Sequence, residues 1–120
     1  MSYDIELTDT GLVEEILELD GVTNFRQGTF PLGGSNKCSL NMTYNYSVVL
    51  YDKFDNRDGI MWLHNKIASD TISRIEDTIA NLKDDVVIDY WQPTEGNVKQ
   101  ALCVLLMFAK IHPEGIWRVY

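Results

Sequence analysis

The N-terminal segment alternates between apolar and polar residues. From Ser2 to Thr8 every second side chain is apolar, which is the period of a strand with one buried face. Asp9-Thr10-Gly11 supplies turn residues. Leu12 to Leu19 is expected to return as the second strand of a hairpin, although its spacing also suits a helix. Thr23 to Phe30 has room for a further short strand, and Phe30 to Gly34 predicts a loop.

The middle of the chain changes from strand to helix periodicity. The clearest alternation runs from Leu40 to Tyr46, with one apolar and aromatic face and one face of short hydrogen-bonding side chains. From Val48 the spacing of apolar side chains becomes four, which predicts a short helix to about Asp55. Ile60 to Ile67 is apolar and irregular, and it suits either a short helix or a strand.

A second helix is predicted by apolar side chains at steps of three and four, with Ser69 or Asp70 as its cap. This stripe consists of Ile72, Ile75, Ile79 and Leu82. After it, Val86 to Trp91 is prone to form a strand, which Pro93 would close.

A third helix is expected from Glu95 to Ile111, with Thr94 as its N-cap and Pro113 beyond its end. Its segment from Ala101 to Ala109 is apolar all round, so the rest of the fold should enclose it. The tail from Ile116 to Tyr120 is apolar enough to dock on the body of the protein.

Together these elements predict an α+β fold in a single domain over residues 1–120. An antiparallel β-sheet, built from the N-terminal hairpin and the central Leu40 to Tyr46 strand, should pack against two to three α-helices. The Ile72 to Leu82 helix would cover the sheet, and the C-terminal helix would be buried.

Composition narrows the classes of function. Against 10 Lys and Arg stand 18 Asp and Glu, a net charge of -8, so direct binding to nucleic acid is not expected. The run from Ala101 to Ala109 is shorter than the roughly 20 residues that span a bilayer, and the N-terminus lacks a secretory signal. Cys38 and Cys103 lack metal-ligand spacing and fit a reducing compartment. A cytoplasmic protein without membrane association is therefore expected.

Acidic residues concentrate near the N-terminus. Seven of the 18 lie in the first twenty residues, which contain no Lys or Arg, whereas the remaining 11 nearly balance the 10 bases. Charge runs usually face water, but such a face can also dock on a basic partner surface. The candidate partner-binding residues are Asp4, Glu6, Glu14, Glu15, Glu18 and Asp20.

The sequence carries no specific catalytic signature. His64 and His112 are its two imidazoles, and no carboxylates stand at metal-ligand spacing from them, so neither a metal nor another cofactor is expected. His112, at a helix C-terminus, is explained by the helix dipole. Asp84, Asp85, Asp89 and Glu95 could include a catalytic acid pair, but a solvated loop is the favoured interpretation.

Two segments have the character of a ligand site. Around Tyr44 to Tyr46, flat phenol rings stand beside amide side chains. From Trp91 to Asn97 an aromatic segment leads into a helix N-terminus, where free N–H groups and Gly96 would admit another backbone or a ligand. The alternative is that the tyrosines pack the sheet and that Thr94 only caps the helix. The candidate ligand-binding residues are Tyr44, Asn45, Tyr46, Trp91, Glu95 and Asn97.

Several strings resemble a family of small uncharacterised proteins from bacteria and their phages. They cover most of the chain in the same order, and they are Gly28 to Gly34, Thr43 to Tyr46, Asp89 to Asn97 with Lys99, Ala101 and Leu102, and Pro113 to Trp117. The resemblance implies a compact α+β domain and a strand at Leu12 to Leu19. It implies no catalytic residue, and a phage origin would favour a counter-defence role.

Three classes of function follow as hypotheses. The first is a non-enzymatic inhibitor of a host protein, whose acidic N-terminal face would engage a basic surface such as the nucleic-acid channel of a CRISPR effector. The second is a small-molecule binding protein, such as a sponge for a nucleotide-derived signal. The third is a small hydrolase that uses Asp89 or Glu95 with a histidine.

Overall fold

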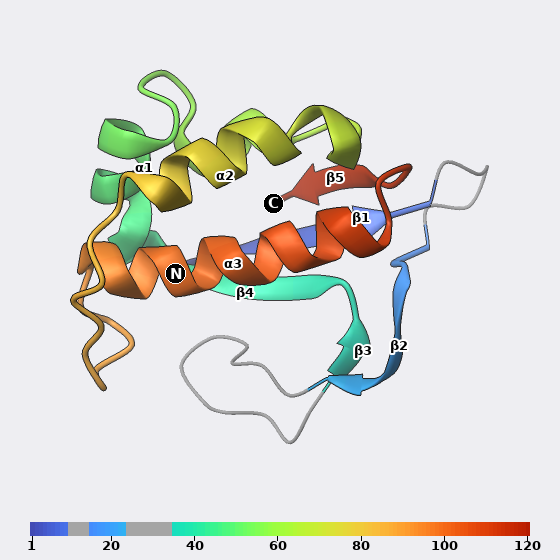
Figure 1. Cartoon of the computed structure of the whole chain (residues 1–120), viewed down its shortest axis with the longest axis horizontal. Helices are drawn as coiled ribbons and strands as arrows, with labels where there is room; N and C mark the ends of the chain where they lie inside the picture. The colour runs from blue at the N-terminus through green and yellow to red at the C-terminus, as the bar shows by residue number, and fades with distance from the viewer. Residues whose placement is uncertain (10–14, 24–34) are drawn as a thin grey trace.

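β1 (Ser2–Thr8) is the middle strand of a three-stranded antiparallel sheet with the order β4-β1-β5. β4 (Ser39–Thr43) pairs along one edge of β1 and β5 (Ile116–Val119) along the other (Figure 1). This computed structural model describes residues 1–9, 15–23 and 35–120, and for residues 20–23, 35 and 36 it describes the backbone alone. The predicted α+β class is confirmed.

The alternation within β1 sorts its side chains onto two faces of the sheet. Ile5 and Leu7 are fully buried on the inner face, among buried residues of β4 and β5. Asp4 and Glu6 point the opposite way, because successive side chains of a strand lie on opposite faces. The charge pattern of the N-terminus therefore leaves one face of the sheet polar.

A second sheet extends from this core and contains β2 (Glu18–Thr23) and β3 (Ser35–Lys37) (Figure 1). The chain does return beside β1, since Ile16 forms a bridge with Thr8, but the strand that follows pairs with β3. Residues 10–14, which belong to the predicted turn and to the start of the predicted hairpin partner, lie outside the described residues. So do residues 24–30 of the expected short strand and the loop to residue 34.

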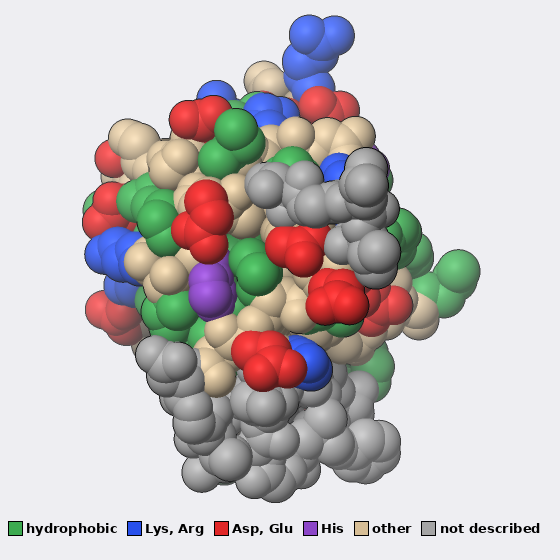
Figure 2. All heavy atoms as spheres, turned by 90° about the vertical axis from the view of Figure 1, so that its right-hand side faces the viewer, with side chains coloured by type: hydrophobic (Ala, Val, Ile, Leu, Met, Phe, Trp, Pro, Cys, Tyr) green, Lys and Arg blue, Asp and Glu red, His purple; other side chains and the backbone are tan. Residues whose placement is uncertain are grey.

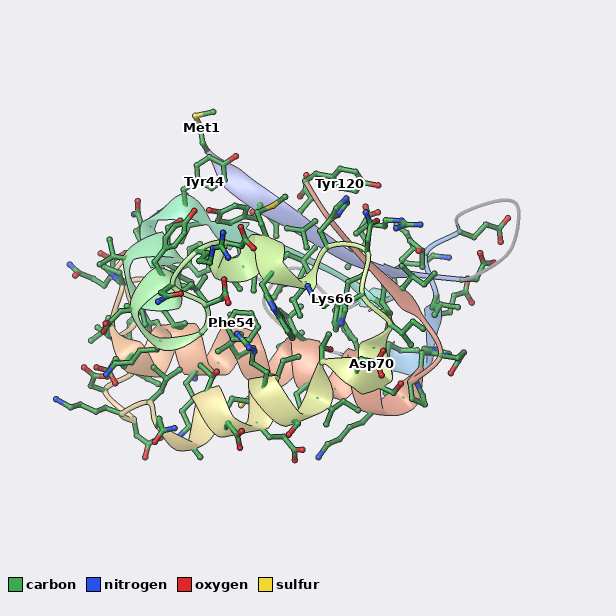
Figure 3. The ribbon with its side chains drawn as sticks, turned by 90° about the horizontal axis from the view of Figure 1, so that it is seen from above. Met1, Tyr44, Phe54, Lys66, Asp70 and Tyr120 are labelled. Atoms are coloured by element: carbon green, nitrogen blue, oxygen red, sulfur yellow. The ribbon has the colours of Figure 1, made fainter. Side chains whose placement is uncertain are left out.

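Three α-helices accompany the sheet: α1 (Ser47–Lys53), α2 (Ile72–Ala80) and α3 (Glu95–Ile111). α3 runs along the inner face of the sheet, and α2 packs beside it on the same side (Figure 1). Seen from above, both helices lie on the side of the sheet opposite to Met1 and Tyr120 (Figure 3). No helix within the described residues is long and apolar enough to cross a bilayer.

α3 has the predicted bounds and cap, since Thr94 Oγ1 accepts a hydrogen bond from the backbone N–H of Asn97. Its buried face consists of Gly96, Asn97, Val98, Leu102, Leu105, Phe108 and Ala109. The expectation that its apolar segment is enclosed all round needs correction. Cys103 is exposed and Val104 and Met107 are half-buried, because the sheet and α2 cover two sides of the helix and leave a third open.

The predicted stripe of α2 faces the core, with Ile75 and, just after the helix, Leu82 buried and Ile72 and Ile79 half-buried, but the expected cap is wrong. Ser69 and Asp70 lie in a short 3₁₀ turn, and Thr71 is the residue before the helix. Gly59–Leu63 also forms a 3₁₀ turn, whereas Ile67 makes an isolated bridge with Ile116. The ambiguous segment from residue 60 to 67 thus contains a helical turn at its start and a strand-like bridge at its end.

Two predicted strands differ in the structure, one in its end and one entirely. The one expected from Leu40 to Tyr46 ends at Thr43, and Tyr44–Tyr46 forms a 3₁₀ turn that leads into α1. Val86 to Trp91 has no strand pairing at all. The Tyr44 N–H donates to the Met1 carbonyl, whereas the backbone of residues 86–91 binds side chains from elsewhere in the chain, as shown for the candidate site below.

The tail docks as predicted, because β5 completes the sheet. Its outer edge is covered by residues 64–68: the N–H of Asn65 donates to Trp117 O at 2.8 Å and the N–H of Trp117 to Lys66 O at 3.0 Å. The Trp117 indole N–H donates at 2.9 Å to the hydroxyl of Thr71, which itself donates at 2.7 Å to the Ala68 carbonyl. Both Trp117 and Thr71 are fully buried.

Replacing Thr71 by Val should lower the free energy of unfolding by about 1–3 kcal/mol, because the buried indole N–H of Trp117 loses its acceptor. Urea unfolding followed by Trp fluorescence measures the change. Thr71→Ser keeps the hydroxyl and should retain most of the stability. Equal stability of Thr71→Val and the wild type would show that this hydrogen bond contributes nothing.

Candidate functional site

The segment from residue 83 to 93 is irregular, and the side chain of Asn97 holds it in place. Asn97 is buried in the first turn of α3, where the Thr94 cap fixes its position. Its amide oxygen accepts from the N–H of Val87 at 3.0 Å, and its amide nitrogen donates to the carbonyls of Asp89 and Gln92 at 3.1 and 3.0 Å. One side chain thus supplies hydrogen-bond partners to three backbone groups, the role that a neighbouring strand would have if this segment were part of a sheet.

Tyr90 joins the same segment to the free edge of β4. Its phenol accepts from the backbone N–H of Thr43 at 2.8 Å and donates to the carbonyl of Asn41 at 3.2 Å. Tyr46 in turn donates its hydroxyl to the Tyr90 carbonyl at 2.6 Å, and the Asn45 amide donates to the Trp91 carbonyl at 3.1 Å. The two sequence segments singled out as ligand sites therefore meet in space.

The N-terminus of α3 is occupied by the chain itself. The N–H of Gly96 donates at 2.9 Å to the carboxylate of Asp85, and the Glu95 carboxylate accepts from the N–H of Lys83 at 3.1 Å. A Cβ at position 96 would lie 2.5 Å from the backbone nitrogen of Val86. The close approach that Gly96 permits is thus used by the protein's own backbone.

Between α3, β4 and this segment lies a cleft of about 210 Å³. Its lining residues are Leu40, Asn41, Tyr46, Val87, Tyr90, Asn97, Gln100, Ala101 and Val104. The hydroxyls of Tyr46 and Tyr90 and the amide of Asn97 already bind the chain, so the cleft offers mainly apolar surface. Its volume is below the roughly 300–1,000 Å³ of sites for drug-sized ligands.

The predicted ligand residues are distributed unequally around this cleft. Tyr46 and Asn97 line it, whereas Asn45, Trp91 and Glu95 stand among the hydrogen bonds beside it. Tyr44 is instead packed against the ring of Tyr3, with ring centroids 4.5 Å apart.

Tyr90 is the central residue that sequence reasoning passed over in favour of its neighbour Trp91. The aromatic pair was visible in the sequence. Tyr90 is the ring that faces inward, because its phenol binds the backbone of Thr43 at the edge of β4. This contact joins residues 47 positions apart, so the local sequence does not reveal it.

The predicted partner-binding acids fall into two groups. Asp4 and Glu6 lie on the outer face of the sheet, where the Asn41 amide donates to Asp4 at 3.0 Å. Burial, followed by the charge of Asp4, raises the pKa of Glu6. Glu15 and Glu18 lie beyond the end of β1. Glu14 and the side chain of Asp20 lie outside the described residues.

Glu15 and Glu18 share one hollow with Asp9, which was not among the predicted binding residues. The hollow measures about 560 Å³, and its other lining residues are Ile16, Leu17 and Lys37. Lys37 approaches Glu18 to 2.5 Å, and this hydrogen bond, with the lysine charge, lowers the pKa of Glu18. We call Asp9, Glu15 and Glu18 the acidic end; Figure 2 looks onto this end, where acidic side chains outnumber basic ones.

His112 connects the acidic end to α3. It follows the last residue of the helix, as predicted, and its Nε2 donates to the carbonyl of Glu18. His64 accepts the backbone N–H of Val119 on Nδ1, beside the edge of β5. Within the described residues, no three His, Cys, Asp or Glu side chains are grouped to hold a metal ion.

Comparisons with models of protein families, with curated proteins and with solved structures give no match to this chain. The resemblance to a family from bacteria and their phages stays a prediction. The function is therefore inferred from the charge and shape of the surfaces described above.

Asn97→Ala should release the segment from residue 83 to 93 and lower the free energy of unfolding by about 1–3 kcal/mol, because buried backbone groups lose their partners. Hydrogen exchange at the Val87 amide should accelerate more than exchange in β1. Gln100→Ala, an exposed change on the next turn of α3, is the matched control. Unchanged exchange at Val87 in Asn97→Ala would contradict this account.

Gly96→Ala should destabilise the fold, although alanine in a helix is normally better than glycine by roughly 0.5–1 kcal/mol. The added Cβ meets backbone at 2.5 Å, so the Asp85–Val86 backbone must move, at a cost of about 1–3 kcal/mol. Urea unfolding decides the sign. A more stable Gly96→Ala variant would show that the segment yields without loss.

Proposed function

We propose that this protein acts without catalysis, by stoichiometric binding of its acidic end to a basic surface of a protein partner. The observation that carries the proposal is the acidic hollow, where three carboxylates face one lysine. Such a surface attracts Lys- and Arg-rich surfaces, and it raises the rate of encounter as well as selectivity. A hollow of about 560 Å³ offers room for guanidinium groups of a partner.

The partner class that best fits this chemistry is a nucleic-acid-binding protein, since its functional surface is rich in Lys and Arg. Occupation of that surface would exclude the nucleic acid and inhibit the partner. The proposed role is therefore that of an inhibitor, for instance of a defence nuclease such as a CRISPR effector. Asp4 and Glu6, on the outer face of the sheet, would contribute to long-range attraction.

Binding of a peptide of six arginines tests the proposed surface. The double variant Glu15→Lys with Glu18→Lys should weaken binding roughly tenfold or more, which corresponds to about 1.4 kcal/mol. Calorimetry at two salt concentrations measures the affinity, and amide NMR shifts locate the site. The control Asp52→Lys with Asp77→Lys changes the net charge equally, at exposed positions on α1 and α2.

Equal weakening by the two double variants would show that only net charge matters, and it would refute a specific acidic end. A functional test uses a purified RNA-guided nuclease whose target cleavage is followed at increasing amounts of this protein. Inhibition should saturate at one protein per nuclease and disappear with the Glu15/Glu18 double variant alone. Inhibition that persists in this variant would place the contact elsewhere.

A further inference from the structure

An exposed apolar loop lies at the end of the molecule opposite to β2 and the acidic end (Figure 1, lower left). Ile88 is 96% exposed, and Val86, Val87 and Trp91 are 46%, 40% and 42% exposed. We call residues 86–91 the apolar loop. Four large apolar side chains within six residues are unusual on the surface of a soluble monomer and mark an interaction site.

The apolar loop is held firmly, so its exposure does not arise from a lack of contacts. Asn97 binds the Val87 N–H and the Asp89 carbonyl within the loop and the Gln92 carbonyl just after it, and Tyr90 anchors the C-terminal half of the loop to β4. Just before the loop, Asp85 is bound to the N-terminus of α3 and Asp84 to Lys99. A loop that is ordered beforehand loses little conformational freedom when it binds.

The cleft of about 210 Å³ adjoins the apolar loop, because Val87 and Tyr90 belong to both. Leu40, Ala101 and Val104 add apolar side chains to its lining. An apolar cavity of about 150 Å³ holds benzene, so this cleft has room for one branched aliphatic side chain. A protruding isoleucine and an apolar cleft of matching size therefore occur on the same surface.

We propose that the occupant of this surface is a second copy of the same chain. A two-fold axis between two apolar loops would bring Ile88 of each copy into the cleft of the other, since an isologous interface needs a projection and its complement on one patch. The proposal does not rest on the acidic end, because the two surfaces lie at opposite ends (Figure 1).

The mixed charge around the loop suits a second copy of the same chain. The rim carries both signs, with Lys83 and Lys99 beside Asp84, Asp89 and Glu95. A two-fold arrangement can place the lysines of one copy against the carboxylates of the other.

Sedimentation equilibrium of the full chain, from micromolar to millimolar concentration, tests the proposal. The wild type should form a dimer, and Ile88→Asp should weaken it roughly thirtyfold or more, as expected when a central interface residue is lost. Ile67→Asp is the control, since Ile67 is also an exposed isoleucine but lies at the edge of β5. Urea unfolding of each variant shows whether it is folded.

A second variant tests the cleft without changing the loop. Ala101→Phe places a ring inside the cleft and should weaken the dimer as Ile88→Asp does. The Glu15→Lys, Glu18→Lys double variant should dimerise like the wild type. A wild type that stays monomeric at millimolar concentration overturns the proposal, as does a dimer that both Ile88→Asp and Ala101→Phe leave intact.

Discussion

The fold depends on β1 lying between two strands that are distant in sequence. Its pairing partners are Ser39–Thr43 on one side and Ile116–Val119 on the other, so neither hairpin geometry nor a short turn creates this sheet. α3 packs on the inner face of this sheet, and α3 supplies Asn97, which holds the segment before it. The site therefore forms with the whole fold, as is typical of proteins dominated by long-range contacts.

Sequence reasoning succeeded where the determinants are local. The bounds of α3 follow from the Thr94 cap and Pro113, and the face of β1 follows from its alternation. It failed at residues 44–46 and 86–91, whose composition favours strands. At residues 86–91 the side chains of Asn97 and Tyr46 bind the backbone, and the strand before residue 44 ends where the Tyr90 phenol binds the Thr43 N–H, contacts that no periodicity reveals. For the same reason the cleft could be predicted only through some of its members, such as Tyr46 and Asn97.

The two proposed surfaces differ in physical character and complement each other. The acidic end attracts over distance and is weakened by salt, whereas the apolar loop acts on contact and depends less on salt. A two-fold dimer through the loop would carry two acidic ends that point away from the interface. Such a pair can engage two basic sites at once and so bind more tightly than either end alone, if the spacing of the sites allows it.

Both edges of the main sheet are closed, one by residues 64–68 and the other by the phenol of Tyr90. Strand addition, in which a partner's backbone extends a sheet, is thereby blocked at the covered positions. This favours recognition through side chains at the ends of the molecule, as in the two proposed surfaces. A few surface substitutions could redirect this protein to a new partner while the sheet and α3 remain as they are, which makes the fold a stable support for rapidly changing specificity.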